Sequence, residues 1–174
     1  QTHGNIELIV IDGASTDNSC AIVKEYQQKH KNIILLSEPD EGIYDAMNKG
    51  VAKCKGDYLF FMGADDVLYN ENVIQNLIVS GALANNEVVY GNVLIKGNND
   101  WASDGQIYDG KFDLNKLLQK NICQQAIFYP RRVFDEYGLF DLRFPVSSDW
   151  IFNLKIFSKE KFVYTDQTIA IFAT

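Results

Sequence analysis

Several features that identify common classes of protein are missing from this sequence of 174 residues. Its three cysteines, Cys20, Cys54 and Cys123, are too widely spaced to form a disulfide framework or a zinc pattern. We therefore expect a reducing compartment, in which the cysteines act as small core residues. No apolar run approaches the roughly 20 residues that a membrane-spanning helix needs, so no spanning segment is expected.

Positive charge is also scarce. The chain has 16 lysines and arginines against 23 acidic residues, which gives a net charge of −7. Binding to nucleic acid requires clustered positive charge, whereas the basic residues here are scattered, so no nucleic-acid partner is expected. The sequence also lacks Gly-x-Gly-x-x-Gly and Gly-Lys-Ser/Thr loops, which weakens the case for a dehydrogenase or a P-loop protein.

Short apolar segments alternate with amphipathic segments through the first half of the chain. This alternation is typical of an α/β fold, with helices on both faces of a mostly parallel, Rossmann-like central sheet. Residues 96–105 are polar and glycine-rich, which indicates a hairpin or loop. We expect a single domain over residues 1–174, with halves at 1–86 and 87–174. The expected strands cover residues 7–11, 33–36, 58–62, 88–95, 126–129, 162–164 and 168–172.

Helices are expected where apolar residues recur at helical spacing. In residues 43–54 this spacing predicts a buried face opposite a polar face that carries Asp45 and Asn48. Ser15 or Thr16 can cap an earlier helix. Further helices are expected near 73–78 and 113–119. The inward positions predicted for three helices are Cys20, Val23 and Tyr26; Ile43, Ala46, Met47, Gly50, Val51 and Cys54; and Trp150, Leu154 and Phe157.

Two adjacent carboxylates, Asp65 and Asp66, follow the apolar strand expected at 58–62. Because like charges repel, such a pair is usually held by a divalent cation, by the hydroxyls of a ligand or by a helix start. A carboxylate at the edge of a sheet can bind Mg²⁺ or Mn²⁺, which neutralises the phosphates of a nucleotide. The alternative is simple helix capping.

Other acidic residues stand at strand ends and helix starts. Asp12 ends the first strand and can accept hydrogen bonds from a base or a ribose, while Gly13 lets a ring approach the backbone. Asp45 and Asn48 could hold the same ligand, although a solvated helix face is the alternative. Asp149 at a helix start is a candidate general base, with an N-cap as the equal alternative.

In combination, five segments resemble the family 2 glycosyltransferases of the GT-A fold, the nucleotide-diphospho-sugar transferase fold. They follow the family's order and cover nearly the whole chain. The long segment at 38–50 most resembles bacterial enzymes that build capsule, exopolysaccharide or O-antigen. The five segments are residues 9–17, 38–50, 56–66, 123–128 and 148–150.

The resemblance implies a role for each matching acidic residue. Asp12, beside Gly13, would contact the uracil of the donor, and Asp45 would help to seat the nucleotide. Asp65 would face the ribose or the donor sugar, and Asp66 would bind the divalent metal. Asp149 would deprotonate the acceptor hydroxyl, which attacks the anomeric carbon opposite the leaving nucleotide and inverts its configuration.

The resemblance also implies partners. The donor would be a UDP-sugar bound with Mn²⁺ or Mg²⁺ by residues 1–86, and the acceptor a saccharide or a lipid-linked saccharide, contacted by residues 87–174 and the polar segment 96–105. We expect a cytoplasmic location at the inner face of the membrane, peripheral membrane association and a homo-oligomer. The alternatives are a nucleotidyltransferase of similar fold or a catalytically inert binding domain.

The sequence departs from the family pattern in three places. The family's first strand and nucleotide-binding loop should precede Gln1, so we expect the N-terminus to have been cut from a longer chain. Gln124, next to Gln125, stands where His is common, which leaves a role for these two amides open. Gly63 stands where Asn, Ser or Asp is common, which leaves fewer side-chain ligands beside the metal.

Overall fold

A computed structural model of the chain describes residues 1–98 and 102–173. The chain forms two compact units. Each unit combines segments from both halves of the sequence. The larger unit contains Gln1–Gly4, Phe60–Pro130 and Asn153–Thr174, and the smaller unit contains Asn5–Leu59 and Arg131–Phe152.

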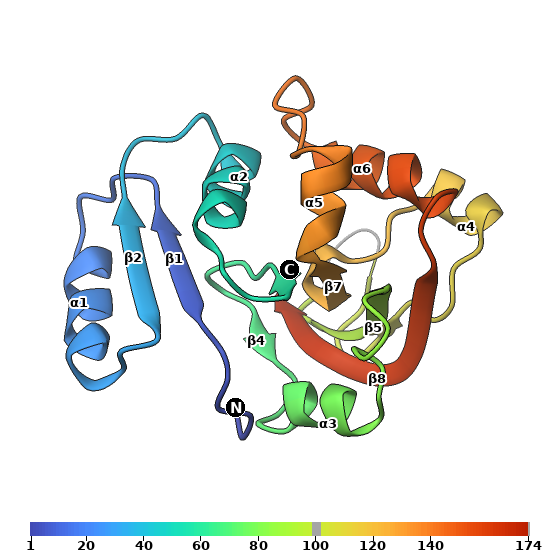
Figure 1. Cartoon of the computed structure of the whole chain (residues 1–174), viewed down its shortest axis with the longest axis horizontal. Coiled ribbons are helices and arrows are strands. Elements are labelled where there is room, and N and C mark those ends of the chain that lie inside the picture. The colour runs from blue at the N-terminus through green and yellow to red at the C-terminus, as the bar shows by residue number, and fades with distance from the viewer. Residues whose placement is uncertain (99–101, 174) are drawn as a thin grey trace. The chain divides into compact units, whose positions relative to one another are not determined.

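The smaller unit is built on a pair of parallel strands. Strand β1 (Leu8–Asp12) pairs with β2 (Ile33–Ser37), and the two run side by side in Figure 1. Helix α1 (Ser19–Lys29) connects them and packs on β2, while α2 (Ile43–Lys53) packs on β1. These elements confirm the strand–helix alternation predicted for the first half of the chain.

The larger sheet has the strand order β3-β7-β5-β8-β4, with β6 paired to β5. Strands β5 and β8 pair in parallel, whereas β8 pairs with β4, and β5 with β6 and β7, in antiparallel fashion. The α/β class is confirmed, but this sheet is mixed rather than mostly parallel. Its strands are β3 (Tyr58–Phe60), β4 (Val67–Leu68), β5 (Val88–Lys96), β6 (Ile107–Tyr108), β7 (Ile127–Pro130) and β8 (Phe162–Ala173).

Strand β8 is one long curved strand, where the sequence predicted two short ones (Figure 1). Its register against β5 shifts between Tyr90 and Val93, which marks a bulge. A side chain at Gly91 would collide with the carbonyl oxygen of Gln167, so the two strands approach closely only because this residue is glycine. The bulge lets the strand bend without ending.

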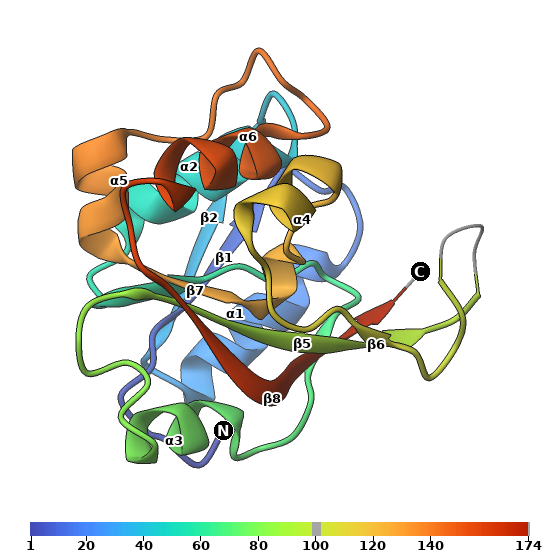
Figure 2. The same ribbon diagram turned by 90° about the vertical axis from the view of Figure 1, so that its right-hand side faces the viewer.

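Strands β5 and β6 form the hairpin predicted around the polar segment (Figure 2). Leu94 pairs with Ile107, and the N–H of Gly105 donates to the carbonyl of Ile95 at 2.9 Å. Residues 99–101 of this segment lie outside the described residues. The remaining helical elements are α3 (Val73–Val79), α4 (Leu114–Gln119), the 3₁₀ turn η1 (Gln124–Ala126), α5 (Arg131–Tyr137) and α6 (Ser148–Phe157).

The predicted inward face of α2 is wrong in part. Ile43 is 57% exposed, whereas Tyr44 and Asn48 are buried. The reason is tertiary: Tyr44 packs on the ring of Phe140, and Asn48 bonds to the backbone of the same residue. Periodicity places apolar side chains on a helix, but it does not show that a distant loop covers the polar face.

Two other predicted helix faces need correction. Helix α1 has no buried residue, and Tyr26 lies on its surface, stacked on His30. Neither Ser15 nor Thr16 caps this helix, because Asn18 occupies the N-cap position. In α6 the buried side chains include Phe152 and Ile156 rather than the predicted Trp150, Leu154 and Phe157.

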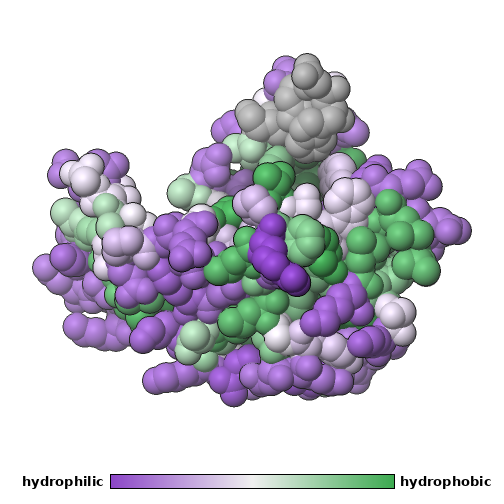
Figure 3. Space-filling model, turned by 90° about the horizontal axis from the view of Figure 1, so that it is seen from above, coloured by the Kyte–Doolittle hydropathy of each residue, from purple (hydrophilic) through white to green (hydrophobic). Residues whose placement is uncertain are grey.

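The core of the larger unit lies around β5, whose residues Val88–Val93 are all buried. Large apolar side chains also remain on the surface, with Val79 and Val146 the most exposed, and Figure 3 shows apolar patches interspersed with hydrophilic residues. Among residues 1–98 and 102–173, no helix has both the length and the apolar character needed to cross a membrane.

We predict that Asn48→Ala lowers the free energy of unfolding by about 2–3 kcal/mol, because it leaves a buried N–H and a buried carbonyl of Phe140 without partners. Urea unfolding followed by circular dichroism measures the change. The control is Gln28→Ala, which removes an amide from the exposed surface of α1 and should cost less than 0.5 kcal/mol, about the limit for surface changes. Equal costs for the two variants would contradict the structural role of Asn48.

Candidate functional site

Asp12 ends β1 with its carboxylate already held by donors. Its Oδ2 accepts the N–H of Ser15 at 3.0 Å, the hydroxyl of Ser37 at 2.6 Å and the thiol of Cys20 at 3.1 Å. Hydrogen bonds from Ser15, then Ser37 and Cys20, hold the pKa of Asp12 well below its usual range. These three bonds converge on Oδ2 and fix the orientation of the carboxylate. Cys20 therefore contacts this carboxylate rather than acting only as a core residue.

Gly13 allows a second acidic side chain to approach the end of β1. A Cβ atom at this position would lie 2.6 Å from Oδ2 of Asp40, so any larger residue would displace that carboxylate. Asp40 also accepts the N–H of Gly42 at 2.9 Å through Oδ1, which holds the turn before α2. The close approach that the sequence assigned to a ligand ring is thus made, within the protein, by Asp40.

Asp45 lies in the first turn of α2 and helps to hold the turn that precedes it. Its Oδ2 accepts the N–H of Glu41 at 3.0 Å and pairs with the ammonium of Lys49 at 3.1 Å. These two interactions lower the pKa of Asp45. Lys49 also reaches Glu38 at 3.3 Å and the carbonyl of Pro39 at 2.6 Å. A cluster of ion pairs and hydrogen bonds therefore fixes the start of α2.

Asp149 lies in the first turn of α6 and accepts a short hydrogen bond of 2.5 Å from the hydroxyl of Tyr44. The same hydroxyl lies 3.1 Å from the carbonyl of Val146. Burial, and then the hydrogen bond to the negative carboxylate, raise the pKa of Tyr44 above its usual range, so the phenol stays protonated and donates. The sequence pattern gave no role to Tyr44; its only signal was an aromatic residue between Ile43 and the polar face of α2.

The backbone around Tyr44 is held rigidly within the smaller unit. Asn48, one helical turn later, donates to the carbonyl of Phe140 at 2.9 Å and accepts its N–H at 3.0 Å. The rings of Phe134 and Phe152 pack on Phe140 at 5.5 and 5.2 Å between ring centroids. Because both polar atoms of Asn48 are used in this way, its side chain serves to position the helix.

Asp65 and Asp66 converge on Gly63 in the larger unit. Asp66 is buried, and its carboxylate accepts the N–H of Gly63 at 3.0 Å and that of Ala173 at 3.3 Å. Asp65 is exposed. A Cβ atom at Gly63 would lie 2.8 Å from Oδ2 of Asp66 and 3.0 Å from Oδ1 of Asp65. The absence of a side chain here lets both carboxylates approach the same point.

This pair fits one kind of cation site. Within the described residues, no group of three or more His, Cys, Asp or Glu side chains could hold a metal by itself. Mg²⁺ and Mn²⁺ bind to substrate phosphates through one or two carboxylates, with water completing the shell. Asp65 and Asp66 therefore suit a cation whose other ligands come from a diphosphate.

Gln124 and Gln125 lie in the 3₁₀ turn before β7. Gln124 is buried; the hydroxyl of Tyr129 donates to Oδ1 of Asn153 at 2.7 Å and lies 3.2 Å from Oε1 of Gln124. The Nε2 of Gln124 has no hydrogen-bond partner in the described part of the chain. Gln125 accepts the thiol of Cys123 at 3.2 Å.

The predicted site residues divide between the two units. Asp12 and Gly13 come together at the end of β1, and Asp149 meets α2 through Tyr44. The smaller unit contains Asp12, Gly13, Asp45, Asn48 and Asp149, and the larger unit contains Asp65, Asp66, Gln124 and Gln125.

Comparison with known proteins identifies relatives that are all named as glycosyltransferases. The family model described as glycosyl transferase family 2 matches residues 1–138. A PGL/p-HBAD biosynthesis glycosyltransferase from Mycobacterium bovis is 38% identical over 167 residues, which cover 94% of this chain and 62% of that protein. The chain therefore spans less than two thirds of the length of this relative.

Solved structures share the fold. Staphylococcus aureus TarS 1-349 in complex with UDP-GlcNAc matches with a TM-score of 0.78 at 15% identity, over 97% of this chain and 49% of that one. A mannosyltransferase from Pyrobaculum calidifontis in complex with GDP-Man and Mn²⁺ matches with a TM-score of 0.62 at 14% identity. The match covers 95% of this chain and 47% of that chain. These matches show the predicted GT-A fold.

We predict that Gly63→Ala weakens the binding of Mn²⁺ in the presence of UDP by roughly tenfold to a hundredfold, the size typical of changes to groups that orient metal ligands. The added methyl group would push both carboxylates apart. Calorimetric titration measures the affinity. Gly4→Ala is the matched control, because its Cβ would meet nothing within 4 Å. Unchanged affinity in Gly63→Ala would contradict the role of this glycine.

Proposed function

The chain belongs to glycosyl transferase family 2, and we propose that it transfers a sugar from a UDP-sugar to a saccharide or lipid-linked acceptor, with inversion at the anomeric carbon. The observation that carries this proposal is the set of prearranged carboxylates: Asp12, Asp66 and Asp149 are each held in place by hydrogen-bond donors of the protein. Fixed acidic groups at strand ends and helix starts are what a nucleotide-sugar site requires.

The nucleotide contacts are assigned to the smaller unit. Asp12 presents its carboxylate to the donor's uracil, while Gly13 and Asp40 shape the end of the strand. Asp45 supports the nucleotide indirectly, because its carboxylate is bonded to Glu41 and Lys49 and so fixes the turn. This support comes from geometry and charge on one sheet edge, where α/β proteins bind nucleotides.

Asp65 and Asp66 are assigned to the diphosphate end of the donor. Asp66 would bind Mn²⁺ or Mg²⁺, and the exposed Asp65 would face the ribose or the donor sugar. When bound, the cation supplies positive charge that stabilises the departing diphosphate. The N–H groups of Gly63 and Ala173 hold Asp66 in place whether or not a ligand is bound.

Asp149 is assigned as the general base. It removes the proton from the acceptor hydroxyl as the oxygen attacks the anomeric carbon. A new carbon–oxygen bond forms on one face of the sugar while the bond to UDP breaks on the other, and the electron pair leaves with UDP. Tyr44 acts as a positioning residue, because its hydroxyl donates to one oxygen of Asp149 at 2.5 Å and so orients the carboxylate.

The names of the relatives support a biological setting for this proposal. Proteins named for PGL/p-HBAD biosynthesis and a structure named with UDP-GlcNAc support a bacterial enzyme of cell-surface polysaccharide or glycolipid synthesis. We assign residues 1–86 mainly to the donor and residues 87–174 mainly to the acceptor. A cytoplasmic location at the inner face of the membrane, with peripheral membrane association and a homo-oligomeric state, fits lipid-linked acceptors.

We predict that Asp66→Asn abolishes the dependence of UDP binding on Mn²⁺. The amide oxygen can still accept the N–H of Gly63, but the amide has no second acceptor for the N–H of Ala173 and lacks the charge that binds the cation. Calorimetric titration of UDP with Mn²⁺ and with excess chelator measures the difference. The control is Asp113→Asn, which changes a helix N-cap in the same unit. If Asp66→Asn responded to Mn²⁺ like the parent, the metal assignment would fail.

We predict that Asp149→Asn slows the transfer of GlcNAc from UDP-GlcNAc to water or to an acceptor by about 10²- to 10⁴-fold, the usual contribution of a general base. The release of UDP measures the rate. The affinity for UDP should stay within twofold. Loss of turnover together with UDP affinity would indicate a structural role instead.

We predict that Tyr44→Phe slows the same reaction by roughly tenfold, which is the loss expected for a hydrogen bond to a charged group. It should have no further effect in an Asp149→Asn background, because it acts through that carboxylate. The control is Tyr90→Phe, which removes a buried hydroxyl that accepts the N–H of Phe112. Additive losses in the double variant would show that Tyr44 acts independently of Asp149.

A further inference from the structure

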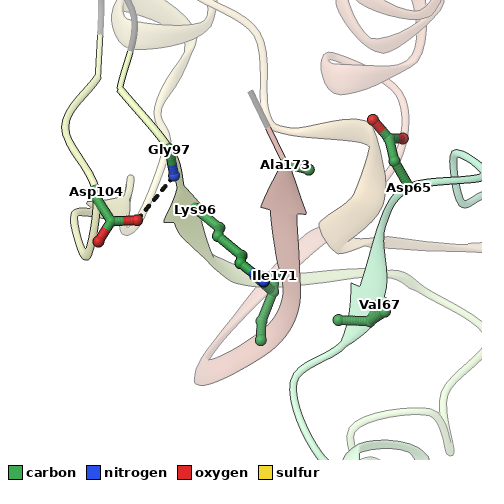
Figure 4. A pocket seen from close by; sticks show the side chains of 7 residues that line it. All are labelled: Asp65, Val67, Lys96, Gly97, Asp104, Ile171 and Ala173. Atoms are coloured by element: carbon green, nitrogen blue, oxygen red, sulfur yellow. Dashed lines mark hydrogen bonds between the residues drawn. The ribbon is translucent and has the colours of Figure 1, made fainter.

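Strands β5 and β8 of the larger unit carry a pocket at each end. The pocket in Figure 4 is lined by Asp65 and by Ile171 and Ala173 near the end of β8, so it belongs to the site described above. A second pocket, of about 380 Å³, is lined by residues 162–164 at the start of β8. Its volume falls within the range of roughly 300–1,000 Å³ that is typical of small-molecule sites. Because β5 and β8 are parallel, the two pockets lie at opposite ends of this strand pair.

The loop that follows α3 forms one wall of the second pocket, and the cap of that helix fixes its backbone. Gly81 has a φ of +74°, in the left-handed region, and its N–H donates to the carbonyl of Ile78 at 3.0 Å. The N–H of Ala82 donates to the carbonyl of Leu77 at 3.0 Å. These two bonds form a Schellman cap, which ends the helix and satisfies two of its last carbonyls.

Lys111 belongs to a second wall, where bonds of its two neighbours hold the backbone. The N–H of Gly110 donates to Oδ1 of Asn92 at 2.9 Å. The N–H of Phe112 donates to the hydroxyl of Tyr90 at 2.8 Å. Asn92 and Tyr90 are buried residues of β5, the middle strand of the sheet. The exposed side chain of Lys111 therefore extends from a backbone that is anchored to the core.

The start of β8 forms a third wall and combines aromatic rings with a second lysine. Phe162 and Tyr164 line the pocket, and their ring centroids lie 6.3 and 5.5 Å from that of the buried Tyr90. Lys161 precedes these rings, and its ammonium pairs with the carboxylate of Glu87 at 2.9 Å. The pocket thus places apolar carbon next to charged groups.

The charge of the groups that line this pocket is positive, although the whole chain has a net charge of −7. Lys111 and Lys161 supply two ammonium groups, and Glu87 supplies one carboxylate. Within residues 1–98 and 102–173, the ammonium of Lys111 has no ion-pair partner. The nearby carboxylate of Asp166 accepts the hydroxyl of Tyr164 at 2.9 Å and does not line the pocket. One positive charge is therefore left for a ligand.

We propose that this second pocket binds a phosphate monoester, at a site separate from the nucleotide-sugar site. The phosphate oxygens accept hydrogen bonds from the ammonium groups of Lys111 and Lys161. The organic part of the ester packs on Phe162 and Val163, which removes apolar surface from water. Glu87 opposes binding, because its carboxylate repels the phosphate and competes with it for Lys161. The site does not depend on the function proposed above.

The first experiment compares three probes of the proposed chemistry. Phenyl phosphate, inorganic phosphate and phenol are titrated into the chain without any metal ion and are followed by NMR. Phenyl phosphate should bind most tightly, because it alone combines the charge with an apolar ring. Tighter binding of inorganic phosphate would show that the apolar wall is not used. Equal affinities for phenyl phosphate and phenol would overturn the phosphate assignment.

The second experiment locates the site with charge variants. Lys111→Met should weaken the binding of phenyl phosphate by about threefold to tenfold, the range for a lost charged contact near the surface. Glu87→Gln should strengthen it by a similar factor, because it removes the repelling charge and releases Lys161. The control is Lys96→Met, which removes the same charge from the same unit but at the pocket in Figure 4. Lys111 is exposed and Glu87→Gln keeps the size of the side chain, so these variants should fold.

The outcomes separate this site from the nucleotide-sugar site. Opposite effects of Lys111→Met and Glu87→Gln, with Lys96→Met equal to the parent, support the second pocket. If Lys96→Met weakens binding and Lys111→Met does not, the phosphate binds beside Asp65 and the proposal is wrong. If all three variants match the parent, the pocket is not a phosphate site. Because no probe contains a nucleotide, a failure of the chain to bind UDP would leave this result unchanged.

Discussion

Hydrogen bonds from the protein to its own acidic side chains are the interactions on which this site depends. The chain carries a net charge of −7, and three of its carboxylates, at a strand end, beside Gly63 and at a helix start, are held by donors of the protein. Ser37 holds Asp12 at 2.6 Å, Tyr44 holds Asp149 at 2.5 Å, and a backbone N–H holds Asp66 at 3.0 Å. Each bond fixes one carboxylate oxygen in place.

The consequence is that the protein itself orders these carboxylates within each unit. A carboxylate that is already held by a donor can meet a ligand without the entropy cost of ordering a mobile side chain. Gly13 and Gly63 serve the same purpose, because a Cβ atom at either position would displace a carboxylate. Small residues and donors therefore matter as much to this chemistry as the acids that they place.

The positions of the main acidic residues could be predicted from the sequence, because local patterns indicate where strands end and helices begin. The carboxylates Asp12, Asp65 and Asp66 stand directly after apolar runs, and Asp149 stands at a helix start as expected. The partners of these residues could not be predicted in the same way. Tyr44 meets Asp149 across 105 positions of sequence, and helical periodicity carries no information about such a contact.

In the larger sheet, too, local patterns predict elements but not their long-range partners. The longer strands were found by their apolar runs, whereas the two-residue strands β4 and β6 were missed, and the parallel pairing of β5 with β8 and the bulge at Gly91 depend on partners far along the chain. A local pattern also placed Ile43 inside and Asn48 outside, whereas the loop that carries Phe140 reverses both positions. Local chemistry therefore predicts which residues can act, and tertiary contacts decide how they are held.

The central claim is that this chain activates a UDP-sugar for inverting transfer. Its most direct test is to incubate the chain with UDP-glucose and Mn²⁺ and to follow the released sugar by NMR before its anomers equilibrate. The account predicts that the α-linked donor releases β-glucose first, and that excess chelator stops the release. An α anomer formed first, or an equal rate with chelator, would contradict it.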